Sequence, residues 1–332
     1  MAGLLRLCTV GLAALVGGCG DGSEGLTFAL VPKAMNNPFF DRARDGCKQA
    51  EAELVGVACL YVGPGEHTEQ EQVQIVEDLI TRRVDGIAVA PSNAPAIARA
   101  LTRARAAGVP VITWDSDLLA EDRALRESYI GTRNYEIGVE LARVLTRHKK
   151  NGGTLCIQSG GAAAANHNER MQGLRDTLAD DASDAPPGER LRGQGGWREV
   201  AGCPLYSNDD FPLAVSQLAD VLGRFADLDA FVATGGFPQF VDGAYRQVVS
   251  RHAGRLGSGE LVVVATDTLP MQMELLREGL SQGQVGQRPF EMGYRAIHVL
   301  RDLHEGRPVA DPIHTGLDVC LQENAADCLG AP

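Results

Sequence analysis

The stretch VPVITWD at residues 109–115 decides the fold, because LVVVATD at residues 261–267 closely resembles it. Each is an apolar run that ends in an aspartate. A second matched pair precedes them, VDGIAVA at 84–90 and LDAFVAT at 228–234. Short apolar runs bounded by turns are typical of strands buried on both faces of a parallel sheet. Two similar halves, each with a carboxylate at a strand end, predict one ligand held between two lobes.

Around these runs, strands and helices alternate as in repeated β-α-β units, which predicts an α/β protein with two doubly wound parallel-sheet lobes. In the first half, strands are expected at 26–32, 58–62, 86–90 and 109–114, and helices at 40–54, 69–82 and 95–107. In the second half, helices are expected at 134–148, at 169–178 and through Leu222, and strands at 154–158, around Leu205, at 230–233 and at 261–265. Segment 180–196, rich in Asp, Pro and Gly, is expected to be an exposed loop.

The composition is that of a globular protein with about two domains, since the chain has 332 residues and 44% of them are hydrophobic. The formal net charge is −12. Binding to nucleic acid depends on clustered Lys and Arg that neutralise phosphates, so this charge argues against a nucleic-acid partner.

The N-terminus has the features of an export signal. A short positive start is followed by an apolar stretch at 7–16, too short for a membrane span of about 20 residues. Residues 16–19, Val-Gly-Gly-Cys, resemble the lipobox of bacterial lipoproteins, which implies lipidation of Cys19. We expect a signal peptide at 1–18 and a lipid-anchor tether at 19–25, with simple cleavage to a soluble protein as the alternative. Either form is expected in the periplasm or at the outer face of the cytoplasmic membrane.

Six cysteines remain after the tether, and an even number in an exported protein indicates disulfides. Fifteen pairings of six cysteines are possible. We favour two local pairs and one that joins neighbouring strands of the second lobe, with free buried cysteines as the alternative: Cys47–Cys59, Cys320–Cys328 and Cys156–Cys203.

Several motifs occur together in an order typical of one family. They are VPKAMNNPFF at 31–40, the aspartate at 115, ERMQG at 169–173, the aspartate at 267 and QRP at 287–289. In these features residues 26–320 resemble the ribose-binding-protein family of periplasmic (type I) sugar-binding proteins. The resemblance implies three hinge crossovers, near 132–133, 287–288 and 315–316. The N-terminal lobe would then comprise 26–132 and 288–315, and the C-terminal lobe 133–287 and 316–332.

The same resemblance implies a set of sugar contacts. Asn37 would bond hydroxyls, Phe39 and Phe40 would stack on the sugar ring, and Asp115 would accept from two hydroxyls. From the second lobe, Arg170 would donate, Asp267 would accept from a further pair, and Gln287 would lie at the hinge side. The alternatives are that either Phe packs in the core and that either Asp caps a helix or lies in a turn.

Three departures from the family pattern bear on the ligand. Ser116 stands where the ribose binder has Arg, Asp209 where an aromatic residue is expected, and Gly235-Gly236 where an Asn-Asp pair would follow. Ribose itself is therefore not the expected ligand. Local likeness to the autoinducer-2 and rhamnose binders implies second-rank contacts at Lys33, Asn166 and His167. The alternatives are a surface position for Lys33 and a helix-capping role for His167.

The expected function is capture of a small sugar or sugar-like polyol and its delivery to the permease of an ABC transporter. The alternative is ligand sensing for a chemoreceptor or sensor kinase. Phosphate-loop, nucleophile-elbow and H-E-x-x-H motifs are missing from the sequence, and of seven histidines only His167 is expected in the cleft. We therefore expect a monomeric binding protein that is not an enzyme and has no cofactor or metal.

Overall fold

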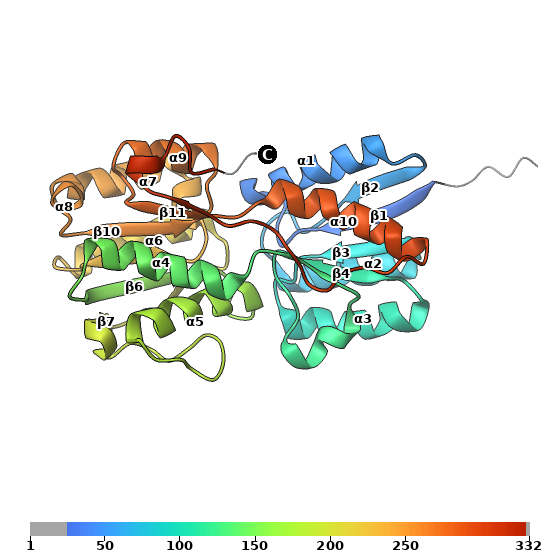
Figure 1. Cartoon of the computed structure of the whole chain (residues 1–332), viewed down its shortest axis with the longest axis horizontal. Coiled ribbons are helices and arrows are strands. Elements are labelled where there is room, and N and C mark those ends of the chain that lie inside the picture. Colours follow the sequence, from blue (N-terminus) through green and yellow to red (C-terminus); the bar gives the residue numbers. More distant parts are fainter. Residues whose placement is uncertain (1–24, 330–332) are drawn as a thin grey trace, which may run out of the picture.

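The computed structural model describes residues 25–329, which form two α/β lobes placed end to end (Figure 1). The sheet of the first lobe has six strands in the order β12-β5-β4-β3-β1-β2. The second has the order β13-β11-β10-β9-β6-β7, with β8 paired to β6. Every pairing is parallel except that of β11 with β13. The two doubly wound lobes predicted from the sequence are thus confirmed.

The first lobe takes most of its elements from the N-terminal half. They are β1 (Leu26–Val31), α1 (Pro38–Glu53), β2 (Val57–Tyr61), α2 (Glu69–Thr81), β3 (Gly86–Val89), α3 (Ala94–Ala107), β4 (Val111–Trp114), the 3-10 helix η1 (Ala120–Leu125), β5 (Tyr129–Gly131), α10 (Pro289–His304) and β12 (Ile313–His314). Strands β3 and β4 are buried along their whole length, which explains why they are apolar except at Thr113.

The second lobe contains the elements between the first and second crossovers and those after the third. They are α4 (Asn134–His148), β6 (Gly153–Ser159), α5 (Ala165–Ala179), η2 (Gln194–Gly196), β7 (Trp197–Glu199), β8 (Leu205–Tyr206), α6 (Phe211–Arg224), β9 (Ala230–Ala233), η3 (Phe237–Phe240), α7 (Asp242–Val249), η4 (Ser250–His252), α8 (Ala253–Ser258), β10 (Val262–Thr266), α9 (Pro270–Arg277), β11 (Gly283–Gly286), β13 (Asp318–Cys320) and η5 (Gln322–Asn324).

Helix α5 begins four residues before its predicted start at Glu169. The residue before the helix is Ala164, which offers no side-chain cap, so the usual start signal is missing from the sequence. Strand β7, directly after the predicted loop, was also not expected.

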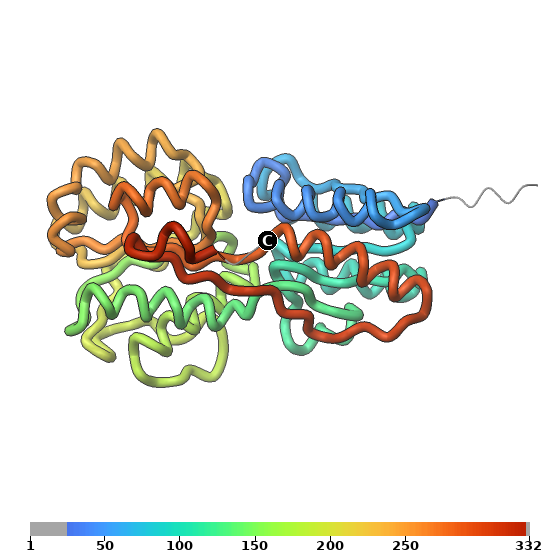
Figure 2. Tube along the Cα trace, turned by 45° about the horizontal axis from the view of Figure 1, so that its top comes forward, coloured from blue at the N-terminus to red at the C-terminus, as the bar shows by residue number. Residues whose placement is uncertain are grey.

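Three crossovers connect the lobes, at residues 132–133, 287–288 and 315–317. Figures 1 and 2 show them as the green and orange-red stretches between the lobes. The first and third are linked by a hydrogen bond of 3.2 Å between the hydroxyls of Thr132 and Thr315. Arg288 of the second crossover pairs with Asp318, directly after the third, at 3.0 Å.

A glycine-mediated helix contact occurs once in each lobe. A Cβ on Gly46 of α1 would lie 2.0 Å from the backbone of α10, and one on Gly293 of α10 would lie 1.9 Å from α1. In the second lobe, Gly138 of α4 and Gly173 of α5 show the same reciprocal approach, at 2.1 and 2.0 Å. The glycines therefore allow α1–α10 and α4–α5 to pack backbone against backbone.

The structure contains three disulfides, Cys47–Cys59, Cys156–Cys203 and Cys320–Cys328, which are the pairs favoured by the sequence. Each joins two segments of one lobe. The expected signal peptide at 1–18 and the anchor at Cys19 lie outside the described residues. Within residues 25–329, no helix is long and apolar enough to cross a membrane.

Candidate functional site

Two aspartates at strand ends face a small cavity between the lobes. Asp115 follows β4 and Asp267 follows β10, and both line the cavity. Both have positive φ, 56° and 78°, a conformation that is uncommon outside glycine and that Asp and Asn tolerate best. Neither caps a helix, since η1 and α9 are preceded by Leu119 and Leu269. The carboxylates thus have positions in which they can meet a ligand.

Asp115 of the first lobe is bonded directly to the second lobe. Asn166 Nδ2 donates to Asp115 Oδ2 at 3.2 Å, and Arg170 Nη2 lies 3.6 Å from Asp115 Oδ1. Lys33 Nζ lies 3.3 Å from Asp115 Oδ2 and donates to Asn166 Oδ1 at 2.8 Å. Lys33 is only 1% exposed, so its predicted alternative, a surface position, is wrong. These contacts cross the lobe interface, and they indicate a closed conformation.

Arg170 is held in place by three hydrogen bonds in addition to its ion pair with Asp115. Its guanidinium donates to Asn134 Oδ1 at 3.0 Å, to the carbonyl of Thr234 at 2.8 Å and to Gln287 Oε1 at 2.9 Å. Helix α5 positions the side chain, which is 1% exposed. A buried guanidinium fixed in this way presents its remaining N–H groups in a defined direction, which suits recognition of neighbouring oxygens.

Gln287 connects Arg170 to Asp267. Its Nε2 donates to Asp267 Oδ1 at 2.9 Å, and the backbone N–H of Gly236 donates to Asp267 Oδ2 at 3.2 Å. Burial raises the pKa of Asp267 to about 6, even though Arg170 and Gln287 favour the charged form. The carboxyl of Asp267 therefore changes its protonation state near pH 6.

Aromatic rings form the apolar part of the cavity wall. Phe39 and Phe40 both line it, and they also pack in the core of the first lobe, with Phe40 edge-on to Trp114 at 5.5 Å. Each ring therefore packs in the core and also has a position in which it can contact a ligand. Asn37 lines the cavity as well, while its Oδ1 caps α1 by accepting from the backbone N–H of Phe39 at 3.0 Å.

His167 lies inside the first turn of α5 and does not precede the helix as a cap. Its Nδ1 is 3.0 Å from the hydroxyl of Thr234, and its ring is 5.3 Å from that of Phe237. Burial, aided by the positive charges of Lys33 and Arg170, holds the pKa of His167 well below its usual range. The imidazole is therefore neutral.

Two side chains at the cavity, and one histidine beside the cleft, were not predicted as contacts. Asp209 and Phe237 line the cavity, although the sequence presents Asp209 only as a departure from the family pattern. The expectation that only His167 among the histidines is near the cleft is wrong, because a Cβ on Gly161 of the second lobe would lie 3.3 Å from the ring of His67. The Gly235-Gly236 pair is the sequence feature that could have indicated a ring packed against this turn. A Cβ on Gly235 would lie 2.4 Å from the ring of Phe237.

The lobes also contact each other away from the two aspartates. The backbone N–H of Ala94 donates to the carbonyl of Ala163 across the lobes at 3.1 Å. The cavity that remains around the predicted residues is about 20 Å³. Small-molecule sites commonly measure at least ~300 Å³. The remaining cavity is far smaller, so a small molecule can enter only when the lobes separate.

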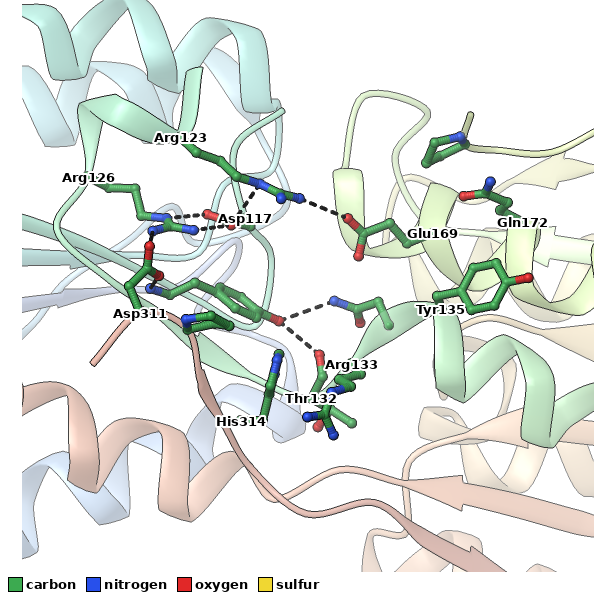
Figure 3. A pocket seen from close by; sticks show the side chains of 14 residues that line it. Asp117, Arg123, Arg126, Thr132, Arg133, Tyr135, Glu169, Gln172, Asp311 and His314 are labelled. Carbon is green, nitrogen blue, oxygen red and sulfur yellow. Dashed lines mark hydrogen bonds and ion pairs between the residues drawn. The ribbon is translucent and has the colours of Figure 1, made fainter. Parts of the chain in front are cut away.

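A larger cavity of about 460 Å³ lies beside the crossovers (Figure 3). Arg123 of the first lobe reaches across it to Glu169 of α5, with 3.8 Å between Nη2 and Oε1. Asn134 borders this cavity and also accepts from Arg170. The hinge side therefore contributes a further contact between the lobes next to the main site.

Two α/β lobes that close over buried carboxylates, an arginine and aromatic rings define a solute-binding protein. A sequence profile of the periplasmic binding protein domain matches residues 28–308. This chain belongs to the periplasmic binding protein family.

Named relatives agree with this assignment. The D-allose-binding periplasmic protein of Escherichia coli is 24% identical over 288 residues, covering 85% of this chain and 86% of that protein. The ribose import binding protein of Salmonella typhimurium is 24% identical over 303 residues, covering 90% and 91%.

Solved structures show the same architecture. An ABC transporter solute-binding protein from Burkholderia graminis, in complex with D-arabinose, is 29% identical, with a TM-score of 0.77 and coverage of 91% of this chain and 97% of that one. One from Agrobacterium vitis with bound D-fucose has a TM-score of 0.80 at 24% identity and the same coverage, which shows the shared fold.

Proposed function

We propose that this protein captures one small neutral sugar between its lobes and delivers it in the closed form to the permease of an ABC transporter. The observation that carries the proposal is the convergence of Asp115, Asp267 and Arg170 on one interlobe cavity. Neutral polyols offer many hydroxyls, and charge-assisted hydrogen bonds to carboxylates and guanidinium are the strong ones. The sugars bound by the relatives support this ligand class.

In the proposed mechanism, the ligand replaces contacts that the lobes otherwise make with each other. Its hydroxyls would take the places that Lys33, Asn166 and Arg170 occupy around Asp115. Phe39 and Phe40 would contact an apolar ring face. Ligand favours the closed form because only there do both lobes contact it. We propose no chemical reaction, cofactor or metal.

A thermal-shift screen tests the ligand class. At a hundred times its dissociation constant, a specific sugar adds about 2.7 kcal/mol of stability, which for a chain of this size raises Tm by about 4 °C. Protein unfolded, freed of ligand and refolded would be screened against D-allose, D-ribose, D-arabinose, D-galactose, deoxysugars, polyols and autoinducer-2. If no compound raises Tm, the proposal is wrong about the ligand class.

Asp267 should release a proton when sugar binds. In the closed form without sugar its pKa is raised to about 6 by burial, and hydroxyl donors from a ligand favour the charged form, so this pKa is lower in the sugar-bound closed form. Measured from the sugar-free closed form, affinity should therefore rise with pH from about 5 to 7, with release of up to about half a proton at pH 6. Calorimetry in two buffers of different ionisation enthalpy measures that release. Equal release by Asp267→Asn and wild-type protein would assign the proton to another group.

The proposal also covers the partner of this protein and its location in the cell. We propose a monomer, anchored by a lipid on Cys19, that meets its permease outside the cytoplasm. A chemoreceptor or sensor kinase is the alternative partner. Stimulation of the ATPase of a reconstituted transporter by the closed, sugar-bound protein supports uptake, while activation of a kinase without such stimulation supports sensing.

A further inference from the structure

Asp209 is a buried carboxylate without a visible structural role. It is 4% exposed, lines the interlobe cavity and has a positive φ of 56°. Among the described residues, none donates a hydrogen bond to its Oδ1. A buried acceptor that lacks a donor costs about 1–3 kcal/mol, and a charged one costs more. Asp209 therefore destabilises the sugar-free closed form.

The surroundings of Asp209 do not supply the missing donor. Lys33, Arg170 and His67 are near enough to act on it electrostatically, yet burial outweighs them and raises the pKa of Asp209. His67, which approaches from the first lobe, also has an Nε2 without a hydrogen-bond partner among the described residues. Two unpartnered polar atoms thus occur in the cleft, one next to Gly160 and one next to Gly161.

The charges around the site limit the kind of group that can donate a hydrogen bond to Asp209. Within residues 25–329, the His and Asp side chains form no cluster that could hold a metal ion. A cationic ligand is disfavoured because Lys33 and Arg170, both 1% exposed, face the same cavity. The donor that remains is a neutral one, and in a sugar that donor is a hydroxyl.

We infer that Asp209 determines specificity by accepting a hydrogen bond from a hydroxyl of the bound ligand. This inference rests on the proposed sugar-binding function and makes it more specific. The ligand carries a hydroxyl at the edge that faces Asp209, so an otherwise identical deoxysugar that lacks this group is discriminated against. Sites built to bond a hydroxyl reject the analogue without it, because their buried polar group is then left unpaired.

Calorimetry with deoxy analogues tests the inference. The probes are the aldose with the largest thermal shift among D-allose, D-ribose, D-arabinose and D-galactose, and its monodeoxy analogues. In wild-type protein, loss of one particular hydroxyl should weaken binding by about 30-fold or more. In Asp209→Ala and Asp209→Asn, the parent sugar should bind at least about 10-fold more weakly, and the penalty at that one position should shrink to within about 3-fold.

The neighbouring acid provides a matched control. Asp210 is exposed and caps α6, with its Oδ1 accepting from the backbone N–H of Leu213 at 2.8 Å. Asp210→Ala should lower Tm and leave the dissociation constant unchanged. The inference is overturned if Asp209→Ala binds the parent sugar as wild type does, or if the penalty of every deoxy position is unchanged.

Sugar-free protein gives a second readout that does not depend on the ligand. Asp209→Asn keeps the shape of the side chain and removes the unpartnered charge, so it should stabilise the closed form and raise the Tm of the sugar-free protein to the extent that this form is populated. A fall in Tm would show that the carboxylate has a structural partner and would overturn the inference even if no sugar binds. A rise in Tm without binding of any sugar would instead contradict the proposed function alone.

Discussion

Replacing Arg170 with alanine should weaken sugar binding by about 100- to 1000-fold, or about 3–4 kcal/mol. The guanidinium bonds Asn134, Thr234 and Gln287 and lies 3.6 Å from Asp115. Its removal would take away the proposed ligand donor and also leave buried acceptors without partners. Titration calorimetry with the sugar identified by the thermal-shift screen measures the loss.

A second buried arginine in the same helix provides the control. Arg175 of α5 is 3% exposed and forms a paired contact with Glu199 inside the second lobe, at 2.8 and 2.9 Å. Arg170→Lys keeps the charge but loses the planar fork, so it should bind at least about 10-fold more weakly. Arg175→Lys, the same change further along the helix, should lower Tm and leave affinity unchanged. Equal affinities for the two lysine variants would contradict a direct role of Arg170.

Most of the fold was predictable because its strands have simple environments. Strands β3, β4, β9 and β10 are buried on every residue, so their sequences are apolar apart from Thr113 and Thr266 and easy to recognise. The start of α3 was predicted within one residue, where Asn93 caps the helix and Pro95 follows. The start of α4 was predicted at Asn134 although Arg133 makes no side-chain cap. No start was predicted for α6, and that of α5, which also has no side-chain cap, was missed by one turn.

The site was harder to predict where its residues come from loops that meet only on closure. Asp115 and Asp267 could be placed because strand ends lie at one edge of a parallel sheet. His67 lies in the loop between β2 and α2 and approaches Gly161 only across the lobe interface. Phe237 belongs to a 3-10 helix after β9, and its ring fits only because Gly235 has no Cβ. Periodicity along the chain carries no information about such contacts.

Replacing Gly138 with alanine should lower the free energy of unfolding by about 3 kcal/mol and Tm by about 4 °C. A Cβ on Gly138 would lie 2.1 Å from the carbonyl oxygen of Arg170, so α4 and α5 must move apart. Because α5 carries Asn166, His167 and Arg170 into the cleft, affinity for sugar should also fall, by about 10-fold for a misplaced donor. Chemical denaturation and calorimetry measure the two effects.

Two other glycines separate this packing effect from helix propensity. Gly223 in α6 has open space where a Cβ would be, with nothing within 4 Å, so Gly223→Ala should stabilise the protein by up to about 1 kcal/mol through propensity alone. Gly293→Ala disturbs the equivalent α1–α10 contact in the first lobe, where a Cβ would lie 1.9 Å from the carbonyl oxygen of Ala43. It should lower stability about as much as Gly138→Ala without displacing Arg170, although α1 also carries Phe39 and Phe40 to the cavity. If Gly138→Ala is as stabilising as Gly223→Ala, the close approach of α4 and α5 does not determine the position of Arg170, and its link to sugar affinity is lost.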